Sequence, residues 1–239
     1  LARSGYVFGG WNTAANGSGS NYDASATYTP AANITLYAKW NPVYTVTFDA
    51  NGGTGAASAS SVSQSTYGGT VNLASQNTLA RSGYVFGGWN TAANGSGSNY
   101  DASATYTPAA NITLYAKWNP VYTVTFDANG GTGAASASSV SQSTYGGTVN
   151  LASQNTLARS GYVFGGWNTA ANGSGSNYDA SATYTPAANI TLYAKWNPVY
   201  TVTFDANGGT GAASASSVSQ STYGGTVTLS QVGTLVKSG

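Results

Sequence analysis

Residues 1–78 recur without change as residues 79–156, and this exact repetition limits the fold more than any other feature of the chain. The third copy, residues 157–234, departs from the first two only between Thr228 and Gly233. A period of 78 residues is too long for one turn of a solenoid and suits a small domain with its own core. We therefore expect small domains in tandem, arranged as beads on a string.

The amino-acid composition argues against two kinds of partner, nucleic acid and membrane. Charged residues make up only 5% of the 239 residues, and each period holds two basic and two acidic side chains, so it is formally neutral. Because no basic surface is available, we expect no nucleic-acid partner. Because no run of about 18 apolar residues occurs, we expect no membrane insertion in these residues. The aromatic share of 13% argues against a disordered linker.

Alternating apolar and polar residues predict strands in each period. Residues 44–49 (YTVTFD) and 111–118 (NITLYAKW) follow the period of two that is typical of half-buried strands. Asn51-Gly52-Gly53 supplies the positive φ angles of a tight turn after the first of these. A further strand is expected within residues 60–73, as the hairpin partner of residues 44–49 or a nearby strand.

Residues 83–91 (GYVFGGWNT) predict another strand, with Tyr84 and Phe86 on one face and Trp89 partly on the other. Residues 74–83 are expected to form one short helical turn or none. Asn119-Pro120-Val121 is predicted to be a short stiff connector, because proline lacks a backbone donor and restricts its neighbour. The expected fold class is mainly β, or α+β at most.

Aromatic side chains are the candidate core, because a domain this small needs its largest rings buried. The expected core aromatics are Phe8, Trp11, Trp40, Tyr44 and Phe48, with their copies in the other periods.

A second set of tyrosines lies among polar neighbours and is the candidate ligand-contact set. It comprises Tyr22, Tyr28, Tyr37 and Tyr67. Their partly exposed rings could contact a glycan or another strand, but ordinary half-buried packing is the favoured explanation.

Catalytic and metal-binding residues are scarce. The chain contains no His, Cys or Glu, and Asp23 and Asp49 are the only carboxylates of the first period. Asp49 with Asn51 could open a calcium loop, but the further carboxylates and the closing Glu are missing, so a turn is favoured. We expect no enzyme activity, no cofactor and no metal site.

Three motifs in order, YTVTFDANGG, RSGYVFGGWNT and ITLYAKW, resemble the Listeria-Bacteroides repeat family, which includes the B-repeat of internalin B. The resemblance implies a β-grasp-like fold with a small curved sheet and little helix. It also implies an extracellular location, on the bacterial cell surface or secreted, and no catalytic residues.

The family's frame predicts two complete repeats between two half repeats, at residues 1–41, 44–118, 122–196 and 200–239. The alternative frame follows the exact period, at residues 1–78, 79–156 and 157–234.

The expected function is a structural spacer or stalk region of a surface protein. Two alternatives stay open: an adhesin that binds a glycan or a host surface protein, and a filament-forming subunit. In the last case, residues 200–239 of one copy would pair head to tail with residues 1–41 of the next, because complementary halves leave unpaired strand edges.

Overall fold

The computed structural model describes residues 1–231 and 233–237, so positions 232, 238 and 239 of the last half repeat lie outside it. The chain divides after Pro120 into two compact units, and each is described by itself. All regular structure in the described residues is β, which confirms the expected mainly β fold class.

Residues 44–120, called the first complete repeat after the family's frame, form a mixed five-stranded sheet and a short two-stranded sheet whose strands alternate in sequence with those of the first. The strands of this repeat are β4 (Thr45–Asp49), β5 (Ser61–Ser63), β6 (Val71–Asn72), β7 (Tyr84–Asn90), β8 (Asn99–Tyr100), β9 (Thr105–Tyr106) and β10 (Ile112–Pro120). The sheet order is β5-β4-β10-β7-β8, and β6 pairs with β9. This arrangement is the β-grasp-like sheet that the resemblance implies, without a helix.

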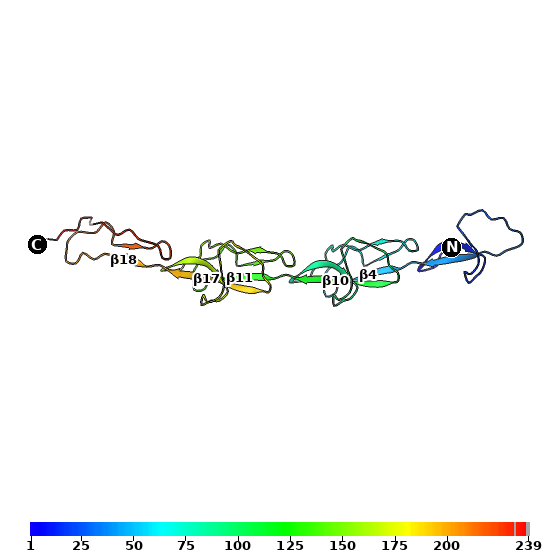
Figure 1. Cartoon of the computed structure of the whole chain (residues 1–239), viewed down its shortest axis with the longest axis horizontal. Helices are drawn as coiled ribbons and strands as arrows, with labels where there is room; N and C mark the ends of the chain where they lie inside the picture. Colours follow the sequence, from blue (N-terminus) through cyan, green and yellow to red (C-terminus); the bar gives the residue numbers. More distant parts are fainter. Residues whose placement is uncertain (232, 238–239) are drawn as a thin grey trace. The chain divides into compact units, whose positions relative to one another are not determined.

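The centre of the sheet is a parallel pair made by the first and the last strand of the repeat. Ile112 lies opposite Val46 and Tyr115 opposite Asp49, and all other pairings in the sheet are antiparallel. Figure 1 shows β4 and β10 side by side. Since β10 has nine residues, it runs on past the end of β4 towards Pro120.

The second complete repeat has the same strands in the same order. They are β11 (Thr123–Asp127), β12 (Ser139–Ser141), β13 (Val149–Asn150), β14 (Tyr162–Asn168), β15 (Asn177–Tyr178), β16 (Thr183–Tyr184) and β17 (Ile190–Pro198). Its sheet order is β12-β11-β17-β14-β15, again with a parallel central pair.

The two half repeats form smaller sheets. Near the N-terminus the sheet order is β2-β1-β3, from β1 (Tyr6–Asn12), β2 (Asn21–Tyr22) and β3 (Tyr37–Pro42). After the second complete repeat, β18 (Thr201–Thr203) pairs with β19 (Ser217–Ser219).

The turn after β4 has the geometry that its sequence requires. Asn51 and Gly52 have φ angles of 49° and 79°, and the Gly53 N–H donates to the carbonyl of Ala50 over 2.9 Å. The Asp49 carboxylate accepts a hydrogen bond of 2.7 Å from the Asn51 N–H. The aspartate side chain therefore stabilises the turn by accepting a hydrogen bond from the turn's backbone, as Asp does in many turns.

The expected faces of β7 are wrong, because the strand contains a bulge. The register with β10 shifts between Phe86 and Trp89, at the double glycine Gly87-Gly88. The extra residue reverses the alternation, so Phe86 and Trp89 contact each other edge to face with ring centroids 5.3 Å apart.

The expected hairpin partner within residues 60–73 is confirmed, because β5 pairs with β4; the same residues also contain a second short strand, β6, which pairs with β9. The expected connector needs correction. Asn119 and Pro120 are not a connector, because they continue β10 and lie opposite Val85 and Tyr84. Only two residues, Val121 and Tyr122, separate β10 from β11.

The core of each complete repeat is assembled from many short segments. In the first repeat the buried residues are Val46, Val71, Leu73, Ala74, Leu79, Trp89, Leu114 and Ala116. Its polar parts are fully bonded: the buried Gln64 accepts from the Tyr44 N–H (3.0 Å) and donates to the carbonyls of Gly69 (2.6 Å) and Pro108 (3.2 Å). No buried side-chain nitrogen or oxygen in the described residues lacks a partner.

Candidate functional site

The expected core aromatics differ in burial between half and complete repeats. Phe8, Trp11, Trp40 and Tyr44 are half-buried, and Phe48 packs against the core of the first complete repeat. The copies of Trp11, which are Trp89 and Trp167, are fully buried.

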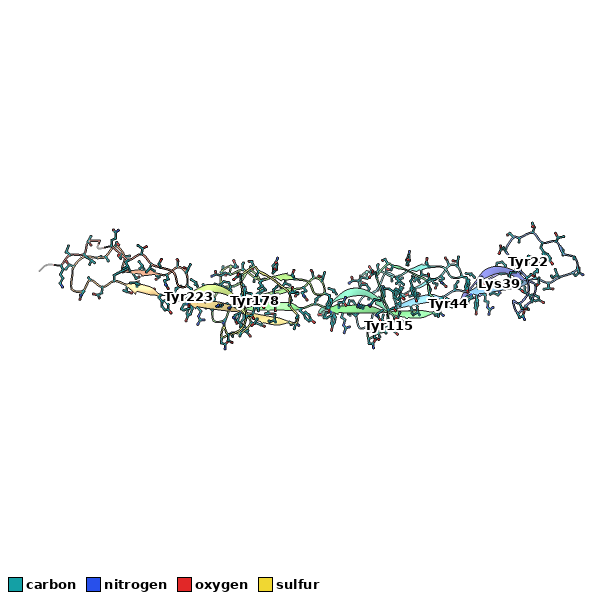
Figure 2. The ribbon with its side chains drawn as sticks, viewed as in Figure 1. Tyr22, Lys39, Tyr44, Tyr115, Tyr178 and Tyr223 are labelled. Atoms are coloured by element: carbon teal, nitrogen blue, oxygen red, sulfur yellow. The ribbon has the colours of Figure 1, made fainter. Side chains whose placement is uncertain are left out.

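The four candidate ligand-contact tyrosines do not gather in one patch. Tyr22 and Tyr28 pack edge to face, with centroids 4.9 Å apart. Tyr37 lies on β3 and Tyr67 in the loop between β5 and β6, where it is 60% exposed. Figure 2 shows Tyr22 on β2 of the N-terminal half repeat and Tyr115, the copy of Tyr37, on β10 of the first complete repeat.

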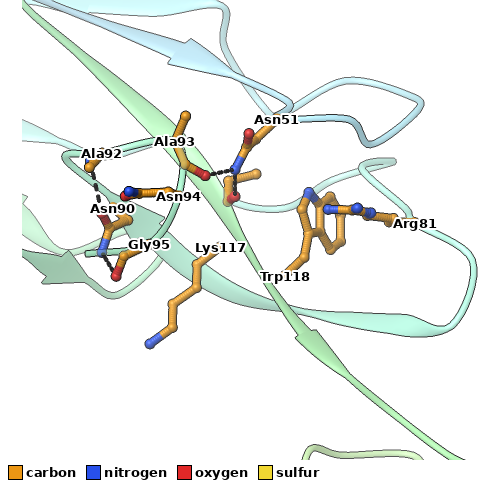
Figure 3. A pocket seen from close by; sticks show the side chains of 10 residues that line it. Asn51, Arg81, Asn90, Ala92, Ala93, Asn94, Gly95, Lys117 and Trp118 are labelled. Atoms are coloured by element: carbon orange, nitrogen blue, oxygen red, sulfur yellow. Dashed lines mark hydrogen bonds between the residues drawn. The ribbon is translucent and has the colours of Figure 1, made fainter. Parts of the chain in front are cut away.

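A pocket that sequence reasoning missed lies beside β10 in the first complete repeat (Figure 3). It has a volume of about 320 Å³. Its side-chain lining comes from the turn after β4, the segment before β7, the loop after β7, and β10. The polar and aromatic members are Asn51, Arg81, Asn90, Asn94, Lys117 and Trp118.

Asn51 joins three of the elements around this pocket. Its side-chain Nδ2 donates to the carbonyl of Ala93 over 2.8 Å and to the carbonyl of Ala116 over 3.0 Å. The turn after β4 is therefore fixed both to the loop after β7 and to β10.

Asn90 holds the loop after β7 in shape. Its side chain is 1% exposed, and its Nδ2 donates to the Gly97 carbonyl over 3.0 Å and to Asn99 Oδ1 over 2.9 Å. Its Oδ1 accepts from the N–H groups of Ala92 (2.8 Å) and Gly97 (3.1 Å). A buried amide with this many partners makes the wall of the pocket rigid.

Arg81 and Trp118 form the other side of the pocket, as Figure 3 shows. The Arg81 guanidinium carbon lies 4.3 Å from the centroid of the Tyr84 ring, within the range of a cation–π contact. The Trp118 indole N–H donates to the Ala50 carbonyl over 2.9 Å. Lys117 precedes Trp118 on β10 and also lines the pocket, with its ammonium pointing away from Arg81 in Figure 3.

The second complete repeat contains the same pocket, with a volume of about 340 Å³. Asn129, Arg159, Asn168, Asn172, Lys195 and Trp196 take the corresponding places. The pocket is thus a property of the complete repeat. The local sequence gives little signal for it, because Arg81 and Lys117 are separated by much of the repeat.

The residues that line the pocket can interact with a ligand through positive charge and hydrogen bonds. Among the described residues, no group of three or more His, Cys, Asp or Glu side chains could hold a metal ion. The carboxylates of the first complete repeat, Asp49 and Asp101, do not line the pocket. A helix able to cross a membrane is not found in residues 1–231 or 233–237.

Comparisons with known proteins agree with the repeat structure. A Gly-rich membrane protein of Evansella cellulosilytica is 35% identical over 241 residues, which cover 95% of this chain and 26% of the relative. A second membrane protein of that organism is 35% identical over 71% of the chain and 25% of its own length. Internalin H of Listeria monocytogenes is 36% identical over 48% of the chain and 20% of its own length.

The chain thus spans about a quarter of the length of these relatives. No solved structure matches it. Four segments, residues 1–39, 44–117, 122–195 and 200–239, match the Listeria-Bacteroides repeat domain. The chain therefore belongs to the Listeria-Bacteroides repeat family.

Proposed function

We propose that this chain is a spacer segment of a bacterial surface protein, which sets the distance between parts of that protein on either side of it. The observation that carries the proposal is the parallel pairing of β4 with β10. Because these strands run in the same direction, the chain enters a repeat at one end of the sheet and leaves it at the other. The nine residues of β10 cover about 30 Å along the strand direction.

Most compact domains have their termini close together, which makes them poor spacers. Here the first and the last strand of the repeat separate the termini by nearly the length of the sheet. Only two residues then lead from β10 into β11. The names of the relatives, two membrane proteins and an internalin, support a location at the cell envelope or surface.

Small-angle X-ray scattering tests the spacer proposal. A single compact globule of 239 residues would have a radius of gyration of about 18 Å. We expect a larger value for the chain. Deleting one period, residues 122–199, should shorten the maximum dimension by about 30 Å.

The control for this deletion is the far-ultraviolet circular dichroism and tryptophan fluorescence of the shortened chain, which should report a folded remaining repeat. A radius of gyration of a compact globule for the full chain, or a maximum dimension that the deletion leaves unchanged, would refute the spacer proposal.

The other expected functions stay predictions. A glycan array probed with the chain and with a Tyr67→Ala/Tyr145→Ala variant tests adhesion through exposed tyrosines. Light scattering over a range of concentrations tests head-to-tail association through residues 1–41 and 200–239. The absence of enzyme activity also stays a prediction.

A further inference from the structure

The cations of each complete repeat line its pocket and the carboxylates do not, although the Asp49 carboxylate is hydrogen-bonded to the N–H of Asn51, which does line it. The first repeat has four charged side chains, and its two cations, Arg81 and Lys117, line the same pocket. Its two carboxylates, Asp49 and Asp101, lie outside that lining. A domain with no net charge therefore presents one locally positive concave site.

The pocket is built before any ligand arrives. Asn51 fixes its turn to the carbonyls of Ala93 and Ala116, and the buried Asn90 fixes the loop that carries Asn94. Since the NH₂ groups of both amides donate to partners inside the repeat, they serve as walls rather than as donors to a ligand. A preformed site loses less conformational entropy on binding.

The remaining donors of the pocket are free for a ligand. Within the described residues, the Arg81 guanidinium and the Lys117 ammonium make no hydrogen bond or salt bridge, and the guanidinium rests over the Tyr84 ring. Asn94 Oδ1 accepts from the Ser96 hydroxyl over 2.7 Å, which leaves its NH₂ group as a donor. The half-buried Trp118 ring adds an apolar surface beside these donors.

We propose that this pocket binds an anionic group, a carboxylate or a phosphate, carried by a hydroxyl-rich polymer. Arginine pairs with either group through two parallel hydrogen bonds, and lysine adds a point charge. The Asn94 amide suits a hydroxyl, and the Trp118 ring suits the C–H face of a sugar or polyol. Each complete repeat carries one such site, so residues 44–198 hold two. This inference goes beyond the spacer function.

Isothermal titration calorimetry of the full chain with three short oligomers tests the proposal. The probes are a galacturonate oligomer for carboxylate, a glycerol phosphate oligomer for phosphate, and a neutral galactose oligomer. We expect at least one anionic probe to bind at two sites per chain, weaker at higher salt, and the neutral probe not to bind. The two anionic arms distinguish the two sources of charge.

A matched pair of double variants separates a built pocket from general attraction. Arg81→Gln/Lys117→Gln removes the cations of the first pocket and should lower the number of sites from two to one. Arg3→Gln/Lys39→Gln removes the copies of these residues in the half repeat, which has no counterpart of the Asn51 turn. This second variant carries the same change in charge and should keep both sites.

The conservative variant Arg81→Lys/Lys117→Arg keeps both charges and should retain the first site. In the Arg81→Gln/Lys117→Gln variant, by contrast, we expect the affinity of the first pocket to fall about tenfold or more, since one charge-assisted hydrogen bond accounts for about that factor. Thermal melting followed by circular dichroism checks that each variant stays folded.

Three results would overturn the proposal. The wild-type chain binds neither anionic oligomer; it binds the neutral oligomer equally well; or the two double variants lose binding to the same extent. The first two outcomes need no variant, so they decide the matter even if a substitution disturbs the fold. None of them bears on the scattering test of the spacer function.

Discussion

Copies of one tryptophan, Trp11 and Trp89, lie in two different environments in this chain. Trp89 is 0% exposed, its indole N–H donates to the Ala74 carbonyl over 2.7 Å, and its ring lies 4.6 Å from that of Phe48. Trp11, in an identical local sequence, is only half-buried. The difference comes from the segments that carry Phe48 and Ala74, which pack against Trp89 within its own repeat.

Replacing Trp89 by phenylalanine should therefore destabilise its repeat strongly. Trp89→Phe leaves a cavity and an unpaired buried carbonyl at Ala74, which together cost about 2–4 kcal/mol. Urea unfolding followed by circular dichroism measures the loss. Trp11→Phe makes the same chemical change in the half repeat and should leave the unfolding of the complete repeats within about 0.5 kcal/mol of wild type. Equal effects of the two variants would contradict the burial argument.

Two glycines with positive φ allow a second comparison at the residue scale. Gly88 has a φ of 91°, and an added Cβ would overlap the carbonyl oxygen of Tyr100; Gly95 has a φ of 78° and open space around it. Gly95→Ala should cost about 1–2 kcal/mol for the left-handed backbone alone. Gly88→Ala should cost about 3 kcal/mol or more, because overpacking adds to that strain. Similar urea midpoints for the two variants would show that the close Tyr100 carbonyl adds nothing to the cost of a side chain at Gly88.

At the scale of elements, the parallel ladder between β4 and β10 orders the start of β10. Ile112 to Tyr115 lie opposite residues of β4. Their copies in the half repeat have no such partner: β3 begins only at Tyr37, and Ile34 is 45% exposed. Identical sequences thus form strand or irregular backbone according to whether a parallel neighbour is present.

Single cysteines should report this difference, because the chain contains no cysteine of its own. Leu114 is 0% exposed, whereas its copy Leu36 is half-buried in irregular backbone. We expect Leu36→Cys to react quickly with a thiol reagent such as DTNB. Leu114→Cys should react only when its repeat opens, at least about a hundredfold more slowly if opening costs about 3 kcal/mol. Comparable rates would show that the ladder does not protect β10.

The contact between β8 and β9 carries a pH dependence. The pKa of Tyr106 is raised above its usual value of 10.0, first by burial and then by the neighbouring Tyr100; the pKa of Tyr184 is raised in the same way beside Tyr178. A raised pKa means that the folded chain holds the phenolic proton more tightly than the unfolded chain does. This stability is present below about pH 10 and is lost as the pH rises through the folded pKa.

The midpoint of urea unfolding, measured between about pH 8 and about pH 12, tests this dependence. We expect a smaller alkaline decrease for Tyr106→Phe/Tyr184→Phe than for wild type. Tyr67→Phe/Tyr145→Phe, which changes two exposed tyrosines, is the control with the same number of phenols removed. A decrease that is the same in all three proteins would contradict a contribution from the raised pKa values.

Local sequence predicted the strands that alternate strictly and missed those that do not. Residues 44–49 and 111–118 show the pattern of a strand because the apolar face of each is buried or half-buried along its length. The two-residue strands β6 and β9 have no local signal, and they exist only because Val71 and Tyr106 meet across the repeat. Pro120 looked like a connector, yet it ends a strand, where the missing N–H is tolerated.

The candidate site was not predictable from local sequence for a related reason. The turn at Asn51 was predicted, but its contacts with Ala93 and Ala116 join residues far apart in the chain. Taken one at a time, the local sequences around Arg81 and Lys117 predict only solvated surface cations. Only the tertiary structure brings them to one pocket and leaves both carboxylates out of it.

At the scale of the whole molecule, each complete repeat has a core of its own. The buried cluster around Trp89 and Leu114 shares no residue with the cluster around Trp167 and Leu192. Repeats coupled through a shared core would unfold together, whereas separate cores predict separate unfolding.

A single substitution should therefore split the unfolding of the chain into two steps. Leu192→Ala removes a fully buried side chain and should destabilise the second complete repeat by about 2–5 kcal/mol. We expect two transitions of similar amplitude in urea, the later one at the wild-type midpoint. Leu114→Ala should give the same curve with the roles of the repeats exchanged. A single transition shifted as a whole would show that the repeats are coupled.

The parallel central pair also decides how a repeat responds to tension. A pull on the two ends of a repeat draws β4 backwards and β10 forwards along the same line, since the two strands are neighbours and run in the same direction. All hydrogen bonds of that ladder are then loaded together in shear, instead of being opened one after another from an end. A surface protein held under flow would gain from this arrangement a module that resists stretching until the whole ladder gives way at once.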